Sequence, residues 1–441
     1  MYFKLSFCNL KRSAYDYLLY IMTMIILVSV LCVSNFIAIY GNIHAGFQTL
    51  ALPLLIIVIM ILLVDYINLF MMKQRAREFA NYLLLGMDKH KLAYMFLIEF
   101  CCIGGLCFIF GELIGTGVCL TVFTSDQQNF KNLSGFIVTN IYQTFFFFIV
   151  VELLSAVRMK QKIYKLQIYD LMNEKRRNQP LEMEKKNYYG YVFIISISVL
   201  LLLLVGIVYL PDDFVFMIIS IISVPLLCCI FAFYKWVYAY LSSKRLLQSD
   251  KLCQGMRIYH IAEITTTTKT SSIMSAIFCI CFIFALTSFV FGIFMLNNKS
   301  EIYMEGSQRF MGFIQLSICI IFLTIYFSAL SFQYIIEIRR QINNFRILYY
   351  MGKNQVQLRS LVKIHLMIKM LLPTLMCFLL LIIVIPFLNH KLNMDLSGVT
   401  NNLFMKAVGI FLTCFAILYL CYFWIAYRLS NRYIKASIKL S

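Results

Sequence analysis

Charged side chains are scarce in this chain of 441 residues. Asp, Glu, Lys and Arg make up 13% of it and hydrophobic residues 61%, whereas an ordinary soluble domain is about a quarter charged and about half apolar. A soluble core cannot hide that excess of apolar side chains. The apolar residues also form runs of roughly 20 or more, the length with which an α-helix crosses a hydrocarbon layer. The sequence therefore predicts an all-α integral membrane protein.

Motifs for nucleotide binding and hydrolysis are missing as well. The chain has no G-x-x-x-x-G-K-[ST] phosphate loop, no H-E-x-x-H helix and no G-x-S-x-G nucleophile elbow, and its five histidines are dispersed. The 15 cysteines show neither a disulfide framework in the outer loops nor the spacing of metal ligands. We therefore expect a non-catalytic chain that binds no metal or cofactor of its own.

Ten apolar runs predict ten transmembrane helices. They lie near residues 18–40, 49–71, 93–123, 134–157, 190–210, 214–234, 272–296, 311–335, 364–388 and 403–427. The first run has no small-residue cleavage site behind it, so we interpret it as a retained helix and not as a signal peptide.

The basic residues predict the orientation of these helices. With both termini inside, the short outer loops hold only five of the 39 Lys and Arg residues, namely Lys131, Lys299, Arg309, Lys391 and Lys406. Since cytoplasmic loops retain Lys and Arg, we expect the N- and C-termini in the cytoplasm. The net charge of +19 then faces anionic membrane lipids, and nucleic acid is not an expected partner.

Two cytoplasmic segments repeat each other. Residues 73–99, the first elbow, align with residues 339–365, the second elbow, after a shift of 266 positions. The shift pairs Phe79 with Phe345, Leu85 with Met351, Gly86 with Gly352 and Leu92 with Leu358. The repeat predicts a 4 + 2 + 4 arrangement, in which a linking pair of helices joins two four-helix units. The expected parts are residues 1–158 (first unit), 159–189 (cytoplasmic linker), 190–234 (linking pair), 235–271 (cytoplasmic connector) and 272–441 (second unit).

Each elbow has the pattern of a short amphipathic helix that ends at a glycine. Its apolar residues recur at i, i+3 and i+4, as Phe79, Tyr82 and Leu83 in the first elbow and as Phe345, Leu348 and Tyr349 in the second. Glycine tolerates a positive φ, so Gly86 and Gly352 are expected to end these helices at the C′ position. The chain can then turn into the next membrane span.

The first elbow resembles the FtsX-like ABC permeases, whose inner loop carries R-x-x-E-F-x-x-L-x-x-x-G, then basic residues and a glutamate. The matching residues are Arg75, Arg77, Glu78, Phe79, Gly86, Lys89, Lys91 and Glu99. The ten-span arrangement and the linker from Lys165 to Lys186 are similar to the bacitracin-resistance (BceB-type) branch. Two departures stand out. Asn343 and Asn344 replace Arg77 and Glu78 in the second elbow, and residues 297–310 are too short for the large extracellular domain of that branch.

The resemblance implies two FtsX-like units in a permease subunit of the bacterial cell membrane. A separate ABC ATP-binding subunit, in two copies, would carry ATP and Mg and drive the handling of an amphiphilic substrate, such as an antimicrobial peptide or a lipid-linked cell-wall precursor. A membrane sensor histidine kinase is a further expected partner. The expected contacts with the ATPase are Arg75, Arg77, Glu78, Phe79, Tyr82, Gly86, Lys89, Phe345, Arg346, Leu348, Gly352 and Lys353.

Polar residues inside the apolar runs are costly in lipid and therefore candidates for function. They are Asp65, Glu99, Glu112, Glu152, His365 and Lys369. One hypothesis pairs Glu99 with His365 or Lys369 across the two halves; the alternative is that each side chain reaches the interface separately. Two other functions stay open, namely a signalling scaffold for a sensor kinase and a secondary transporter that uses these carboxylates. Gly111 and Gly115 predict close helix packing.

Overall fold

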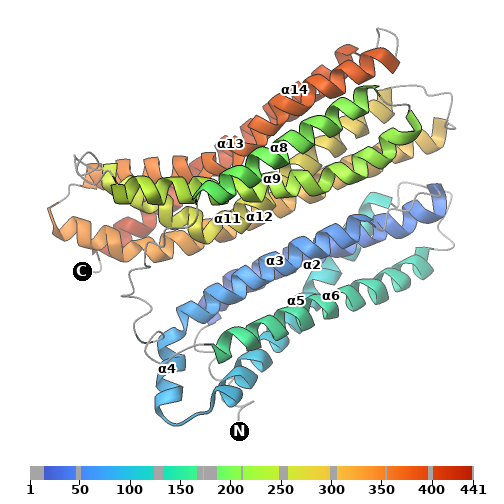
Figure 1. The fold of residues 1–441 in the computed structure, drawn as a ribbon. Coiled ribbons are helices and arrows are strands. Elements are labelled where there is room, and N and C mark those ends of the chain that lie inside the picture. The colour runs from blue at the N-terminus through green and yellow to red at the C-terminus, as the bar shows by residue number, and fades with distance from the viewer. Residues whose placement is uncertain are drawn as a thin grey trace. The chain divides into compact units, whose positions relative to one another are not determined.

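The computed structural model describes residues 14–45, 51–123, 133–165, 172, 186–209, 212–247, 257–297, 305–352, 355–395 and 401–439. The regular elements in this part of the chain are all helices, which confirms the predicted all-α class there (Figure 1). They are α2 (Ala14–Ala45), α3 (Ala51–Gln74), α4 (Ala76–Leu84), α5 (Lys89–Phe123), α6 (Leu133–Tyr164), α8 (Lys186–Tyr209), α9 (Asp212–Leu247), α11 (Arg257–Asn297), α12 (Glu305–Tyr350), α13 (Gln355–Asp395) and α14 (Asn401–Lys439).

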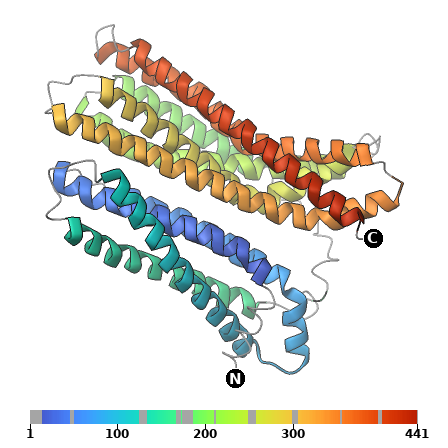
Figure 2. The ribbon, with the colours of Figure 1, turned by 180° about the vertical axis from the view of Figure 1, so that it is seen from behind.

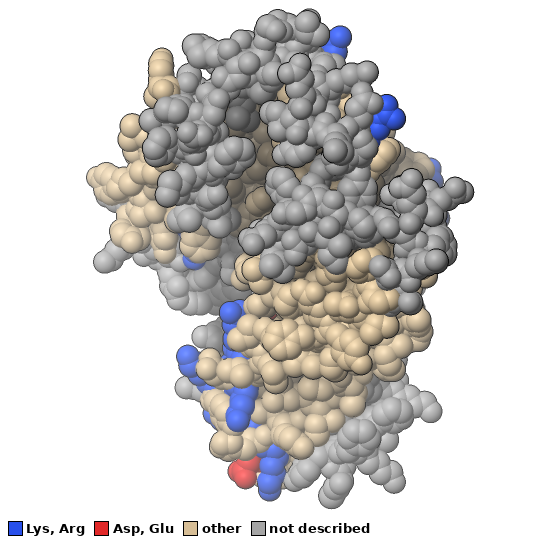
Figure 3. Space-filling view, turned by 90° about the vertical axis from the view of Figure 1, so that its right-hand side faces the viewer, with Lys and Arg blue, Asp and Glu red and all other residues tan. Residues whose placement is uncertain are grey.

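Nine helices among the described residues are long and apolar enough to cross a membrane. Each of them overlaps one of the predicted spans, which supports a multi-pass membrane protein. The tenth predicted span, 214–234, falls within α9, where the side chains of residues 212–224 lie outside the described part. The count of ten and the 4 + 2 + 4 arrangement therefore stay predictions. Among the described residues visible in Figure 3, basic side chains outnumber acidic ones.

The chain divides into two compact units, of which the first comprises residues 1–179 together with 327–332. In this unit α2 packs against α3, α5 and α6, and α6 also contacts α3 and α5. The contact of α2 with α5 is close because α5 presents glycines to it. A Cβ atom added at Gly111 would lie 2.7 Å from Cβ of Val28, and one at Gly115 would lie 2.7 Å from Cβ of Cys32. The predicted close packing at these glycines is confirmed.

The second compact unit comprises residues 180–326 and 333–441. Within it α8 packs along α9, while α11 contacts α9, α13 and α14, the last of which is the red helix in Figure 2. The Tyr234 hydroxyl on α9 donates a 3.0 Å hydrogen bond to the carbonyl of Pro373 on α13. Leu200 and Leu204 of α8 form a small apolar cluster with neighbours from α9 and α13. The expected linking pair is thus packed into the same unit as the last helices.

Candidate functional site

The first elbow contains a short helix between two candidate membrane spans. Helix α3 ends at Gln74, and Arg75 interrupts the helical geometry with φ −97° and ψ 13°. Helix α4 then runs for nine residues, from Ala76 to Leu84, in a direction that differs visibly from that of α3 (Figure 1). The break at Arg75 therefore separates the elbow helix from the span that precedes it.

Gly86 ends this helix, as the sequence predicts. Its φ is 89°, its N–H donates to the carbonyl of Leu83 at 3.1 Å, and the N–H of Met87 donates to the carbonyl of Tyr82 at 3.0 Å. These two bonds form a Schellman motif, which satisfies carbonyls at the end of the helix. Gly352 has a φ of 88°, and its N–H donates to the carbonyl of Tyr349 at 3.0 Å. Both predicted glycine turns are confirmed.

The second elbow differs from the first in the helix that leads to its glycine. Helix α12 runs through 46 residues, from Glu305 to Tyr350, and includes residues 339–350 of the second elbow without a break. Gln341 occupies the position equivalent to Arg75 after the shift of 266 positions. The amphipathic segment that the sequence predicts is therefore present in both halves, but it is a separate helix only in the first.

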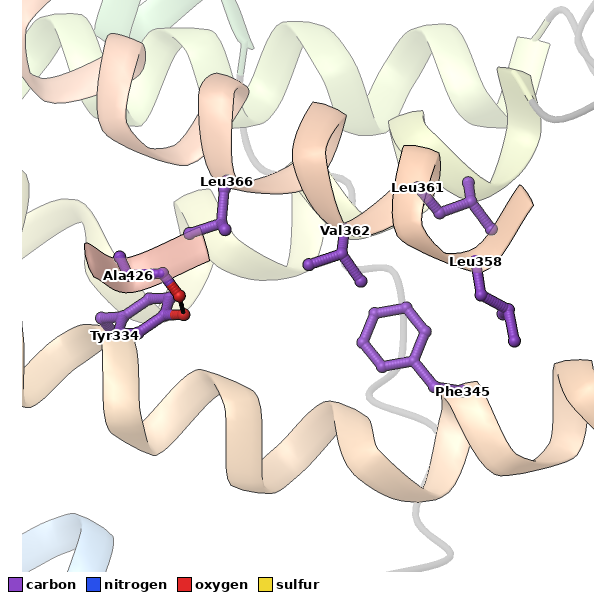
Figure 4. Packing of buried hydrophobic residues seen from close by; sticks show 7 residues of the cluster. All are labelled: Tyr334, Phe345, Leu358, Leu361, Val362, Leu366 and Ala426. Atoms are coloured by element: carbon purple, nitrogen blue, oxygen red, sulfur yellow. Dashed lines mark hydrogen bonds between the residues drawn. The ribbon is translucent and has the colours of Figure 1, made fainter. Parts of the chain in front are cut away.

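The two phenylalanines of the repeat fix the elbows to the spans that follow them. Phe79 is buried, and its ring meets the ring of Phe96 on α5 edge-on at 5.3 Å between centroids. Phe345 is buried in a cluster with Leu358 and Val362 of α13, toward which it points in Figure 4. Val362 is the repeat counterpart of Phe96. The same anchoring contact therefore occurs twice.

Large apolar side chains are exposed just before each glycine. Leu84 and Leu85 are 59% and 84% exposed, and their repeat counterparts Tyr350 and Met351 are 64% and 74% exposed. We call these two pairs the elbow tips. None of the four is among the ATPase contacts expected from the sequence, although the repeat alignment pairs Leu85 with Met351. Those contacts were chosen from the i, i+3, i+4 face and the charged residues and not from the residues next to the glycine. The repeat alignment could have identified the elbow tips, because it places a large apolar pair directly before the glycine in both elbows.

The other expected ATPase contacts have varied environments. Arg77 and Glu78 are exposed, whereas Tyr82, Arg346 and Leu348 are half-buried. Lys89 donates to the carbonyl of Tyr164 on α6 at 3.3 Å, which ties the start of α5 to the end of α6. Lys353 lies outside the described residues.

Arg75 is buried, although the sequence pattern places it among the ATPase contacts. Its side chain is 3% exposed and forms an ion pair with Glu99 of α5, whose side chain is 0% exposed. The Nε atom of Arg75 also donates to Glu78 at 2.8 Å, and its guanidinium lies 5.5 Å from the ring centroid of Phe79. Arg75 thus joins the helix break, α4 and α5.

Two further polar contacts hold α6 to its neighbours near the first elbow. Arg158 of α6 forms an ion pair with Asp65 of α3, and the Tyr164 hydroxyl contacts Nδ1 of His90 on α5. Asp65 was predicted as an intramembrane polar residue, whereas its partner was not. These polar contacts therefore connect α3, α5 and α6 near the first elbow.

Glu112 and Glu152 lie deeper in the first unit. Cys32 donates to Oε1 of Glu112 at 3.3 Å and accepts from Asn140 at 3.2 Å, so the carboxyl group belongs to a buried polar network between α2, α5 and α6. Glu152 lies against α5 at Gly104, where an added Cβ would be 2.7 Å from its Oε1. Gly104 therefore leaves the room that this carboxyl group occupies.

The remaining intramembrane residues belong to the second unit. His365 is half-buried on α13, and the side chain of Lys369 lies outside the described part of the chain. The pairing of Glu99 with His365 or Lys369 stays a prediction; the partner of Glu99 identified here is Arg75. Among the described residues, no group of three or more His, Cys, Asp or Glu side chains could hold a metal ion.

Part of the chain matches a known protein family. Residues 50–167 match the family described as FtsX-like permease C-terminal, which covers α3 to α6 and the whole first elbow. The chain therefore contains an FtsX-like permease domain, the kind found in membrane permease subunits of ABC-type transporters. Such subunits are generally non-catalytic and typically work with an ABC ATPase subunit. No curated protein matches the chain.

Proposed function

We propose that this chain is the permease subunit of an ABC-type complex and that a separate ATPase, present in two copies, binds the two elbow tips. One observation carries the proposal. In both halves two large apolar side chains are exposed directly before a glycine with positive φ, and in both a buried phenylalanine anchors the same segment to the next span. Contiguous exposed apolar surface marks a contact with a protein or with the membrane, and its repetition at two equivalent turns favours two equivalent sites on a partner.

The contacts of the two buried phenylalanines could transmit movement of the elbow tips to the membrane spans that follow. Movement of the first tip would act on α5 through Phe79 and Phe96, and movement of the second would act on α13 through Phe345 and Val362. Arg77 and Glu78 add exposed charges beside the first tip. ATP and Mg would be bound by the partner, since this sequence lacks a phosphate loop.

The substrate we propose is amphiphilic, such as an antimicrobial peptide or a lipid-linked cell-wall precursor. The support is the resemblance to the BceB-type branch. The same resemblance supports a location in a bacterial cell membrane and a sensor histidine kinase as an additional partner. The distribution of Lys and Arg supports cytoplasmic N- and C-termini. Secondary transport has weaker support, because two of the four intramembrane carboxylates, Asp65 and Glu99, already form ion pairs with arginines.

The proposal is tested by removing the apolar tips without disturbing their anchors. Two double variants, Leu84→Ser with Leu85→Ser and Tyr350→Ser with Met351→Ser, are purified from membranes of the native host. The bound ATP-binding cassette protein is then measured by mass spectrometry. We expect each double variant to retain less ATPase than the wild type, and the two combined to retain little or none.

Tyr188→Ser is the matched control, because Tyr188 is 62% exposed at the start of α8 and lies outside both elbows. This variant should retain the wild-type amount of ATPase. Equal retention by the tip variants, or a wild-type protein that purifies without any ATPase, would overturn the proposal.

A further inference from the structure

The helical segments of both elbows end at a glycine with positive φ, but they are connected differently to the membrane span that precedes them. In the first elbow, Arg75 lies at the break between α3 and α4 and forms an ion pair with Glu99 of α5. In the second, the repeat counterparts of these residues are Gln341 and His365, which cannot form an arginine–carboxylate pair. Helix α12 passes through the equivalent of the break without interruption.

Helix α4 needs external contacts to keep its direction. It has nine residues, and isolated helices shorter than about 12–15 residues are only marginally stable in water. Two contacts with α5 stabilise this short helix, namely the packing of Phe79 on Phe96 and the ion pair of Arg75 with Glu99. The ion pair also constrains geometry, because a guanidinium presents its donors in a fixed planar fork.

We propose that Arg75 and Glu99 are positioning residues that hold α4 against α5, so that the first elbow transmits the movement of the ATPase through a buried ion pair while the second transmits it along the continuous helix α12. The inference rests on the proposed function. It deepens that function by making the two ATPase contacts mechanically unequal. It also gives Arg75 a role inside the permease, where its buried guanidinium is not available to a partner.

The test transfers the residues of the second elbow into the first. The double variant Arg75→Gln with Glu99→His is compared with the wild type and with Arg359→Gln, which removes one exposed positive charge from α13. Three quantities are measured in full-length protein reconstituted in lipid with the ATPase that co-purifies from the host. These are the hydrogen exchange of residues 76–86 and 345–352, the affinity for the ATPase, and the rate of ATP hydrolysis at saturating ATP.

We expect the double variant to exchange residues 76–86 about tenfold faster and residues 345–352 at the wild-type rate. Its affinity for the ATPase should change by less than about twofold, because the tips stay in place. The rate of ATP hydrolysis at saturating ATP should fall by about tenfold, which corresponds to a rise of about 1.4 kcal/mol in the activation free energy. Arg75→Lys keeps the charge but loses the fork, so it should give a smaller change in the same direction. Arg359→Gln should match the wild type.

Unchanged exchange in residues 76–86, or an unchanged hydrolysis rate, would overturn the inference. If the double variant does not fold, Arg75→Lys decides the question by the same two measurements. A wild-type protein that binds no ATPase would instead refute the proposed function. The exchange measurement would then still show whether the ion pair holds α4.

Discussion

Gly86 and Gly352 share a left-handed backbone conformation, with φ values of 89° and 88°, although they lie in different halves of the chain. They are the positive-φ residues of the part of the chain that the structure describes. At both positions an added Cβ would meet nothing within 4 Å. Glycine is therefore required there by backbone conformation and not by lack of space.

Gly86→Ala and Gly352→Ala should each destabilise the protein by about 1–2 kcal/mol, because an L side chain at positive φ is strained. The effect is measured as a fall in melting temperature in detergent, and it should be similar for both variants. Gly105→Ala is the control, since Gly105 also has open space around it but lies inside helix α5. That change should be neutral or stabilising, because alanine favours a helix by about 1 kcal/mol over glycine.

Phe79→Ala and Phe345→Ala should each cost about 3–5 kcal/mol, the usual range for truncating a buried phenylalanine. Both side chains anchor an elbow to the following helix, so hydrogen exchange should increase first within that elbow. Phe79→Leu and Phe345→Leu keep most of the apolar volume and should lose less stability. Loss of stability without any local change in exchange would contradict the anchoring role.

Gly111→Ala and Gly115→Ala should separate α2 from α5. Each new methyl group would meet a side-chain carbon of α2 at 2.7 Å, and overpacking of this kind typically costs about 1–3 kcal/mol. The melting temperature in detergent measures the effect. Gly117→Ala on the same helix has no atom within 4 Å of the new methyl group and should leave the melting temperature unchanged.

Glu112→Gln should be tolerated and Glu112→Lys should not. The amide keeps an oxygen that can accept from Cys32, as the carboxyl group does at 3.3 Å. A lysine at the centre of a membrane helix costs about 2.5–3.5 kcal/mol. The amount of protein inserted in the membrane and its melting temperature report the difference. Equal values for the two variants would show that the network around Cys32 contributes nothing to the fold.

Local sequence signals predicted most of the helices and both glycine turns. Long apolar runs predicted the membrane helices because length and hydropathy alone determine whether a helix can cross the bilayer. The turns at Gly86 and Gly352 followed from a conformational preference that only glycine meets without strain. These features depend on residues that are close together in the chain.

Features that depend on contacts between distant residues were not predicted. The sequence pattern treats Arg75 as a surface residue, whereas its burial depends on Glu99, 24 positions later on another helix. The partner of Asp65 is Arg158, 93 positions away, and periodicity carries no information about that contact. The break at Arg75 and its absence in α12 were also missed, because neither segment contains a proline or glycine at that point.

The length of α12 has a mechanical consequence. At 1.5 Å per residue its 46 residues span about 69 Å, more than twice the hydrocarbon thickness of about 30 Å. Because α12 is one continuous helix, a small tilt of its membrane span would produce a large sideways displacement of Tyr350 and Met351 at its end. In the first half the helix is interrupted at Arg75, at the equivalent position. The movement of α4 relative to α3 therefore depends on how strongly the ion pair of Arg75 with Glu99 restrains it.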